Sequence, residues 1–558
     1  MVLQNIVWPE QDGQPEKELY YHGVPKYTED GKLCIKAGDT LSFDTYFNSF
    51  SGKNWIQYTV VTQCTFCLIL RGRGEVVLKE EDGSALKIIS FRGNENIRIS
   101  LSNIKEKMYY LEIRAKEDSI LESGQVVTEQ SHREIHLVLV TCTYNRQKEL
   151  FGNLAVLKRK NRILQDGKPV LDWIYIVDNA RNLIPEEIED ETTVLFPNPN
   201  TGGAGGFTRG LREAMKDSSM THVLLMDDDV KIEFEAVART KGLLAYLKDE
   251  YKDNFIGGAM LRKETPYMIY ACGESWDNGK IINPHQDTDA RTLEKVIEVM
   301  EVSPLPCQYN GWWYCCVPRS QMEEKGYPMP FFLHGDDIEY GLRNGKTPLY
   351  LNGIAVWHES FEDKMPSMLW YYDVRNWLII NAIYMKKGKR LNAIGIVIKN
   401  TLASILRYRY EDVKLSAMAV EDFLKGSDWL YRADPEQVHQ KVQQLGYQMR
   451  ELSDEDKQLE ITLNYACGLK NRLRMMIGYI LPARGRIKVR MGAPAGTYAR
   501  KKEVWLVEPN SQKGFLVRKS WWKTVKCVGM IISNIFRLFG LYSLKIKYNG
   551  MKYIRGEN

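Results

Sequence analysis

The stretch Ile135-His-Leu-Val-Leu-Val-Thr-Cys-Thr-Tyr-Asn-Arg146 decides the fold class of this chain. Its first part, residues 135–141, is an almost continuous apolar run, which is typical of a strand buried on both faces of a sheet. A helical stretch is expected over 147–164, and three more short apolar runs come at 173–177, 193–196 and 223–226. A further helix is expected over 206–217. Strands that alternate with helices in this way predict an α/β domain with a parallel sheet, over residues 131–395.

The regions on either side of this domain have different patterns. Residues 1–130 carry short runs rich in Ile, Val, Phe and Tyr, separated by turn signals such as Asp30-Gly31 and Asp82-Gly83. This pattern predicts an N-terminal β-sandwich of the jelly-roll type. Such a domain could bind carbohydrate, serve in assembly or be purely structural. Residues 396–558 are expected to form a mainly helical C-terminal region.

The end of the C-terminal region is basic and amphipathic. Between residues 516 and 555, lysines and arginines are interspersed with apolar residues, and Trp521 is followed by Trp522. A helix of this composition suits the surface of an anionic membrane, and packing on another domain is the alternative. No run of 18 uncharged apolar residues and no signal-peptide pattern is present. We therefore expect a cytoplasmic protein that associates peripherally with the inner face of the cell membrane.

Composition excludes several classes of protein. The 558 residues include 76 Lys and Arg against 71 Asp and Glu, a net charge of +5, and 44% are hydrophobic. These values are typical of a folded globular protein, and so small a charge surplus gives no reason to expect a nucleic-acid partner. Cys64 and Cys67 lie in an apolar run where side chains three positions apart point to opposite faces of a strand. A zinc site is therefore not expected there.

Polar residues follow each of the four strands predicted for the central domain. In an open α/β sheet, ligands bind beyond the carboxyl ends of the strands, so these residues are expected to lie close together. They include Arg146 after the first strand, Asp178 and Asn179 after the second, Asn200 after the third, and the triplet Asp227, Asp228 and Asp229 after the fourth. Side chains of these types can hold a nucleotide and a metal ion.

The three consecutive aspartates need a physical explanation. Carboxylates this close repel one another unless a cation relieves the repulsion. Alternate residues of an extended segment point the same way, so Asp227 and Asp229 could share Mg²⁺ or Mn²⁺ while Asp228 is turned elsewhere. An acidic loop exposed to water is the alternative. His358 follows an apolar strand over 348–356, where it could be a third ligand or an ordinary core histidine.

Three further motifs could contribute to a site. The run Gly202–Gly206 lacks the ending of a phosphate-binding P-loop, and is expected to be a plain turn or a loop that approaches a ligand closely. Trp312 and Trp313 could form a platform for a sugar ring or fill the core. Asp336 and Asp337 fall in the first turn of a predicted helix, whose dipole keeps them ionised. An ionised aspartate in a cleft can accept a proton from an attacking hydroxyl, and helix capping is the alternative.

Taken together, these motifs resemble a family 2 glycosyltransferase of GT-A fold, and more narrowly the galactofuranosyltransferases that build cell-wall galactan. The resemblance covers residues 134–380, and the β-rich front and helical back also match that subfamily. Its motifs occur in the family's order: Val140-Thr-Cys-Thr-Tyr-Asn-Arg146, Val177-Asp-Asn179, Asn200-Thr-Gly-Gly-Ala-Gly-Gly-Phe207, Asp227-Asp-Asp229, Trp312-Trp313, Asp336-Asp-Ile-Glu-Tyr-Gly-Leu-Arg343 and Trp357-His358. One departure concerns His334-Gly335, because the subfamily tends to carry a larger aromatic residue there. The acceptor preference is therefore left open.

The resemblance implies a role for each candidate residue. Donor-binding residues would be Arg146, Asp178, Asn179, Asn200 and Asp228. Asp227, Asp229 and His358 would hold Mn²⁺ or Mg²⁺ on the pyrophosphate of the donor. Trp312, Trp313 and His334 would line the sugar and acceptor site. Asp337 would be the general base, with Asp336 beside it as a second catalytic carboxylate.

The implied function is an inverting, metal-dependent transfer of a sugar, foremost galactofuranose, from a UDP-sugar to a glycan or lipid-linked acceptor in cell-surface polysaccharide synthesis. One carboxylate base without a covalent nucleophile means a single displacement, and hence inversion. A rhamnosyl or galactopyranosyl transferase on the same scaffold is an alternative, because a fold does not determine the donor. A non-catalytic glycan-binding membrane scaffold is another, which the intact acidic residues disfavour. The subfamily also leads us to expect a homo-oligomer.

Overall fold

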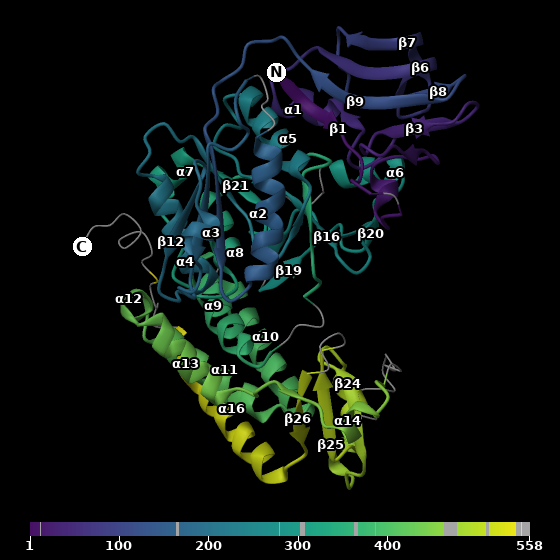
Figure 1. Ribbon diagram of the computed structural model, residues 1–558. Helices are drawn as coiled ribbons and strands as arrows, with labels where there is room; N and C mark the ends of the chain where they lie inside the picture. The colour runs from purple at the N-terminus through teal and green to yellow at the C-terminus, as the bar shows by residue number, and fades with distance from the viewer. Residues whose placement is uncertain are drawn as a thin grey trace.

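The computed structural model describes residues 1–11, 13–162, 167–277, 279–301, 307–361, 366–384, 387–462, 477–508, 513–542 and 548. Three parts of the chain follow one another along the molecule, as the colours of Figure 1 show. N-terminal strands lie at one end and the α/β part lies in the middle. The C-terminal helices, with a small sheet, lie at the other end.

A six-stranded sheet forms the centre of the α/β part. Its order is β12 (Thr193–Pro197), β11 (Trp173–Asp178), β10 (Leu137–Thr143), β13 (His222–Leu225), β21 (Cys315–Pro318) and β15 (Ile256–Gly257). The first four strands are parallel neighbours and correspond to the four apolar runs of the sequence, so the predicted parallel sheet is confirmed. β21 is antiparallel to both of its neighbours. Helix α2 (Gln147–Asn161) follows β10 as expected.

Helix α4 (Gly202–Ala214) begins at the glycine-rich run, which corrects the prediction of a loop or turn there. The glycines are needed because the helix lies almost in contact with β10. A Cβ atom at Gly206 would lie 2.0 Å from the Sγ atom of Cys142, and one at Gly210 would lie 2.2 Å from a methyl carbon of Val140. The N-terminus of α4 therefore stands beside the carboxyl end of β10, and its dipole favours negative charge at that point.

A second sheet extends the α/β part. Its order is β14 (Lys231–Ile232), β22 (Ala355–His358), β16 (Ala259–Arg262), β17 (Met268–Ala271) and β20 (Thr288–Asp289). β14 begins two residues after Asp229, and it pairs with β22 so that Lys231 lies opposite Trp357. This pairing places the carboxyl end of β22 close to the carboxyl end of β13, although the two segments are far apart in the sequence.

The strands of the N-terminal region are joined by hydrogen bonds into one nine-stranded sheet. Its nine strands are β1 (Val2–Ile6), β2 (Lys26–Tyr27), β3 (Leu33–Ile35), β4 (Thr40–Ser42), β5 (Phe50–Ser51), β6 (Cys64–Glu80), β7 (Ala85–Leu101), β8 (Met108–Ala115) and β9 (Ser119–Val127). One edge of β6 pairs with β7, while the other pairs first with β9 over Thr65–Arg71 and then with β8 over Gly74–Glu80. Gly72 lies between these halves with a φ of 126°, a value that favours glycine, so one strand serves both halves.

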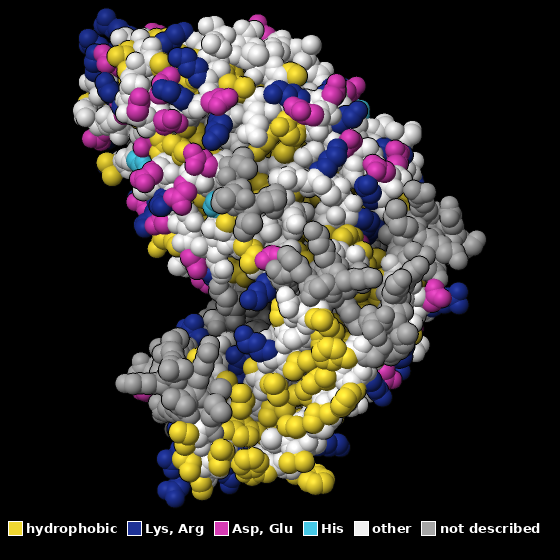
Figure 2. All heavy atoms as spheres, turned by 180° about the vertical axis from the view of Figure 1, so that it is seen from behind, with side chains coloured by type: hydrophobic (Ala, Val, Ile, Leu, Met, Phe, Trp, Pro, Cys, Tyr) yellow, Lys and Arg dark blue, Asp and Glu magenta, His cyan; other side chains and the backbone are white. Residues whose placement is uncertain are grey.

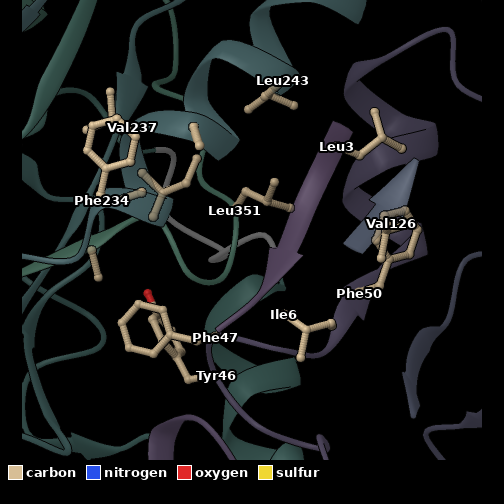
Figure 3. Packing of buried hydrophobic residues seen from close by; sticks show 14 of the residues in the cluster. Leu3, Ile6, Tyr46, Phe47, Phe50, Val126, Phe234, Val237, Leu243 and Leu351 are labelled. Carbon is tan, nitrogen blue, oxygen red and sulfur yellow. The ribbon is translucent and has the colours of Figure 1, made fainter. Parts of the chain in front are cut away.

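A shared hydrophobic core joins the N-terminal sheet to the α/β part. Leu3 of β1 packs beside Leu243 of α5 (Phe234–Tyr246), as Figure 3 shows. The backbone N–H of Asn5 also donates a hydrogen bond to the carboxylate of Glu235 on α5, at 2.9 Å. Because apolar and polar contacts both cross this boundary, the sheet has a defined position on the α/β part.

The C-terminal region combines helices with a four-stranded sheet that the sequence pattern did not predict. Its helices include α9 (Leu369–Tyr384), α10 (Lys387–Leu406), α11 (Tyr410–Leu424), α12 (Ser427–Arg432), α13 (Pro435–Leu445) and α16 (Trp521–Tyr542). The sheet order is β23 (Arg450–Glu451), β26 (Lys513–Arg518), β25 (Glu503–Val507) and β24 (Arg486–Arg490). These strands are short, and glycines and prolines surround β24, so the sequence pattern there resembles a loop.

Helix α16 is amphipathic. Cys527, Ile531 and Leu538 are buried, and the helix lies along α10 and α11. On its other side Trp522 is 79% exposed and Phe536 is 73% exposed. Figure 2 shows a broad hydrophobic surface over this lower part of the molecule. Within the described residues, no helix has both the length and the hydropathy to span a membrane.

Candidate active site

A cavity of about 930 Å³ opens at the carboxyl ends of β10, β11 and β13. Ligand pockets occupy about 300–1,000 Å³, so this cavity is at the large end of the range. The cavity extends past α8 (Asp336–Asn344) to α9 and α13. Its lining includes all but one of the residues predicted for the site: Arg146, Asn179, Asn200, Asp227, Asp228, Asp229, Trp312, Trp313, His334, Asp336, Asp337 and His358.

Asp227, Asp229 and His358 lie together in this cavity. One ligand atom from each side chain lies within 4.8 Å of the other two. Nε2 of His358 is 3.1 Å from Oδ1 of Asp229. Nδ1 of the same ring is 2.7 Å from the carbonyl oxygen of Glu359, a contact that fixes the ring and directs Nε2 toward the aspartates. The three side chains are therefore arranged to bind one cation.

The charges of these residues also fit a cation. Burial and the neighbouring charge of Asp229 raise the pKa of Asp227 to about 7. A divalent ion between the carboxylates would remove this repulsion and favour their ionised form. Two carboxylate oxygens and one imidazole nitrogen are ligands that suit Mn²⁺ or Mg²⁺. The side chains present thus fit the metal that the sequence implies.

Asp228 is directed toward Arg146 instead. Nη1 of Arg146 lies 3.1 Å from Oδ1 of Asp228 and 2.8 Å from Oδ2 of Asp229. Desolvation in the cavity opposes the charge of the guanidinium, but the aspartates outweigh it and raise the pKa of Arg146. The side chain of Asn153 donates to the backbone carbonyl of Asp228 at 2.9 Å and holds the segment in place. Arg146 is thus a fixed positive charge beside the proposed metal ligands.

Asn179 and Asn200 position the beginning of α4. Nδ2 of Asn179 donates to the carbonyl oxygen of Gly202 at 2.9 Å, and Oδ1 of Asn200 accepts from the N–H of Gly202 at 3.2 Å. Both asparagines also line the cavity. Backbone N–H groups at a helix N-terminus bind phosphate groups readily, so this arrangement offers a place for a diphosphate.

The structure does not bring Asp178 into the cavity. Its side chain is buried, and the residue is 1% exposed. Its carboxylate accepts hydrogen bonds from the backbone N–H groups of Ala180, Asn182 and Leu183, at 2.8 to 2.9 Å. An aspartate that accepts three such bonds shapes the turn after β11. This geometry argues against the predicted contact between Asp178 and the donor.

The loop that leads into α8 has an unusual backbone. Gly335 caps the helix with a φ of 85°, and the preceding His334 and Phe332 have φ values of 61° and 72°. Non-glycine residues keep positive φ values only where their surroundings hold them there. Two contacts do so here. The side chain of Asn376 donates to the carbonyl oxygen of His334 at 2.7 Å, and the ring of Phe332 lies 4.6 Å from that of His439 on α13.

Asp336 and Asp337 form the first turn of α8 and reach the cavity. Burial raises the pKa of Asp337 to about 6 and, together with the charge of Asp337, that of Asp336 to about 7. The N–H of Ile338 donates to Oδ1 of Asp337 at 2.8 Å, and this bond and the nearby His334 limit the rise in its pKa. A carboxyl group with a pKa near 6 is ionised at neutral pH and can still accept a proton efficiently.

Trp312 and Trp313 line the cavity, but both are largely part of the core. Nε1 of Trp313 donates to the carbonyl oxygen of Gly258 at 2.9 Å. The ring of Trp312 meets the rings of Phe207 and Tyr340 edge to face. Only a small part of each indole reaches the cavity, so the pair forms a wall rather than an open platform.

Several lining residues were not singled out in the sequence. Glu274 is one, and burial together with the charge of Asp337 raises its pKa to about 8. It stands just before the short strand β18 (Ser275–Asp277), in a segment without a recognisable motif. Trp370, Asp373 and Trp377 of α9 are others. No signal in the sequence marks these residues, because helix packing alone places them at the cavity.

Residues 3–129 match the family model described as galactofuranosyltransferase 2 N-terminal. A relative named galactofuranosyltransferase GlfT2, from Mycobacterium tuberculosis, is 26% identical over 444 residues, which are 72% of this chain and 67% of the relative. The protein of the same name from Mycolicibacterium smegmatis is 32% identical over 436 residues, which are 72% of this chain and 66% of the relative. The chain is a galactofuranosyltransferase-like glycosyltransferase.

This glycosyltransferase spans about two thirds of the length of the two curated relatives. Among solved structures, it is similar to the mannosyltransferase PcManGT from Pyrobaculum calidifontis in complex with GDP-Man and Mn²⁺. That similarity has a TM-score of 0.30 at 12% identity and covers 56% of this chain and 80% of the other.

Proposed function

We propose that this glycosyltransferase transfers galactofuranose from UDP-galactofuranose to a glycan or lipid-linked acceptor in cell-surface polysaccharide synthesis, with inversion at the anomeric carbon. One observation carries the proposal: a single cavity contains both the three-residue cation site and the carboxyl groups of Asp336 and Asp337. The similarity to the two GlfT2 proteins supports galactofuranose as the sugar. Because a fold does not determine the donor, rhamnose and galactopyranose are the sugars to compare.

The donor would occupy the end of the cavity beneath the strand termini. Arg146 and the N-terminus of α4, which Asn179 and Asn200 position, would bind the negatively charged diphosphate. Asp227, Asp229 and His358 would hold the metal ion. When bound, Mn²⁺ or Mg²⁺ would neutralise the charge that develops on the leaving diphosphate.

Asp337 would act as the general base. It takes the proton from the acceptor hydroxyl as that oxygen bonds to the anomeric carbon and the bond to the diphosphate breaks. A single displacement from the face opposite the leaving group inverts the configuration. The positive charge of His334 favours the ionised form of Asp337, which is the form that can accept the proton. A positioned base of this kind contributes about 10²- to 10⁴-fold to the rate.

Helix α16 would place the enzyme on an anionic membrane surface. Its exposed face carries Trp522, Val525, Ile532 and Phe536, and Figure 2 shows that the hydrophobic surface is broad. Apolar side chains of this kind insert into the boundary between headgroups and acyl chains, while neighbouring lysines attract anionic lipids. A lipid-linked acceptor would then be available at the same surface, on the inner face of the membrane.

The first experiment follows the release of UDP or dTDP from a panel of sugar nucleotides with Mn²⁺ present, with and without a synthetic galactofuranoside acceptor. Acceptor-dependent release from UDP-galactofuranose alone would support the whole proposal. If the nucleotide were released from a different sugar nucleotide, the proposed type of reaction would stand and the donor would be that other sugar nucleotide. If the protein bound no UDP, measured by calorimetry, the proposal would be wrong.

A further inference from the structure

One face of α9 is open to the cavity while the rest of the helix is buried. Between residues 371 and 381, Asp373 and Trp377 are the two residues that are not fully buried. Trp370 lies one turn earlier and is also partly exposed. All three line the cavity. Their spacing of three and four residues places them in one stripe along the helix.

The polar centre of this stripe is joined to the loop that carries the base. Nδ1 of His334 lies 2.7 Å from Oδ1 of Asp373, and 42% of the His334 side chain is exposed. Within the described residues, Nε2 of His334 has no hydrogen-bond partner. The ring stands two residues before Asp336, and its charge acts on both Asp336 and Asp337. The open stripe therefore begins beside the proposed base.

The two tryptophans differ from Trp312 and Trp313 in how they are placed. Trp377 meets Trp276 at a ring distance of 5.8 Å and an angle of 62°, which supports one side of its indole. Both Trp370 and Trp377 keep part of their surface open to the cavity. Sugar rings present C–H groups that pack on aromatic faces, and their hydroxyls pair with carboxylate and imidazole groups. The stripe offers both kinds of contact.

We propose that Trp370, Asp373 and Trp377, together with His334, form the subsite that binds the acceptor sugar nearest the reaction centre. The ligand class is a neutral sugar ring that packs on indole and forms hydrogen bonds with the Asp373–His334 pair. A ring bound there would present a hydroxyl group beside Asp337. This inference rests on the proposed function, because it assigns the acceptor end of the same cavity.

A different ligand for the stripe is the uracil ring of the donor, which also stacks on indole. The two assignments predict opposite results for UDP. If the stripe binds the acceptor, changes in it alter acceptor affinity and leave UDP affinity unchanged. If the stripe binds uracil, the same changes lower the affinity for UDP.

Calorimetric titration separates these outcomes. The probes are the methyl glycoside of a galactofuranose disaccharide and, separately, UDP with Mn²⁺. We expect Trp370→Ala and Trp377→Ala each to raise the Kd of the disaccharide about tenfold, with the Kd of UDP unchanged within about twofold. Trp377→Phe should retain most of the affinity. Asp373→Asn and His334→Gln should each lower the affinity for the disaccharide. The double variant should lose less binding free energy than the sum of the two single losses, because the two side chains act as a pair.

The matched control is Trp8→Ala, a partly exposed tryptophan that does not line the cavity. Melting temperatures would show whether each variant is folded. Three results would each overturn the subsite. The first is unchanged disaccharide affinity in both α9 tryptophan variants, and the second is a loss of affinity for UDP instead. The third is no disaccharide binding to the unaltered protein. If the variants lost disaccharide binding as expected but the unaltered protein transferred no sugar, the subsite would stand and the proposed reaction would fail.

Discussion

Nε2 of His358 lies 3.1 Å from Oδ1 of Asp229, although His358 ends a strand of one sheet and Asp229 follows a strand of another. The pairing of β14 with β22 produces this contact. The carbonyl oxygen of Glu359 holds the opposite nitrogen of the ring. The cation site therefore depends on how the two sheets are joined as well as on the aspartate triplet itself.

Removing one of the proposed ligands should abolish the effect of metal on donor binding. We expect Asp229→Asn to lower the affinity for UDP on the order of a hundredfold in the presence of Mn²⁺, because the ion would lose a charged ligand. Calorimetry with and without EDTA measures this effect. Asp249→Asn is the control, since Asp249 is exposed and pairs with Arg133 at the surface. Equal UDP affinity in Asp229→Asn and the unaltered protein would rule out this ligand set.

Replacing the base should separate catalysis from donor binding. Asp337→Asn keeps the shape of the side chain but cannot accept the proton, so kcat should fall by about 10²- to 10⁴-fold. The affinity for UDP should not change. Asp336→Asn should lose less activity, because we assign the proton transfer to Asp337. A larger loss in Asp336→Asn would mean that the two roles are exchanged.

The rate should depend on pH through Asp337. Burial raises the pKa of this carboxyl group to about 6, and the base is active only when ionised. The rate of transfer should therefore fall about tenfold per pH unit below pH 6. The neighbouring titratable groups are Asp336, Glu274 and His334; below pH 6 the two carboxyl groups are mainly protonated and His334 is positively charged. His334→Gln removes the positive charge that favours ionised Asp337. The acid limb of the pH–rate profile of this variant should therefore move to higher pH, and a shift to lower pH would contradict this arrangement.

The close contact of α4 with β10 should make Gly206 intolerant of a side chain. A Cβ atom there would lie 2.0 Å from the Sγ atom of Cys142, so Gly206→Ala should lower the free energy of unfolding by about 1–3 kcal/mol. Gly152→Ala in α2 is the matched control. Nothing lies within 4 Å of a Cβ atom at that position, so the same change should raise the free energy of unfolding by about 0.5–1 kcal/mol. Urea denaturation measures both, and equal stability of the two variants would contradict the packing.

The exposed face of α16 should decide binding to membranes. Trp522→Glu combined with Phe536→Glu should lower the affinity for phosphatidylglycerol vesicles at least about tenfold, because two large apolar side chains no longer insert. The control is Ile88→Glu on the N-terminal sheet, an apolar residue that is 56% exposed. Sedimentation with vesicles measures the bound fraction. A similar loss in the control would show that the effect is not specific to α16.

Local patterns were sufficient to predict much of the α/β part. The apolar runs that became β10 and β13 are continuous, because these strands are buried on both faces of the sheet. In β11 and β12, buried residues are interspersed with half-buried ones, and short apolar runs still marked both strands. The glycine-rich start of α4 has the composition of a turn or a loop, since intrinsic propensities disfavour glycine in a helix and do not report how closely that helix packs. The short strands of the C-terminal sheet carry charged residues and stand among turn signals, so the local sequence does not indicate a sheet there.

By itself, the sequence determined which chemical groups stand at the strand ends: the aspartate triplet, Arg146 and the two asparagines that meet Gly202. Parallel strands place their carboxyl ends at one edge of a sheet, so those groups were bound to converge. Only the tertiary structure decided that Asp178 shapes a turn instead of facing the cavity, and that Glu274 and the stripe on α9 join the site. Those positions depend on contacts between segments far apart in the chain, such as that of His334 with Asp373, and residue spacing alone carries no information about such contacts.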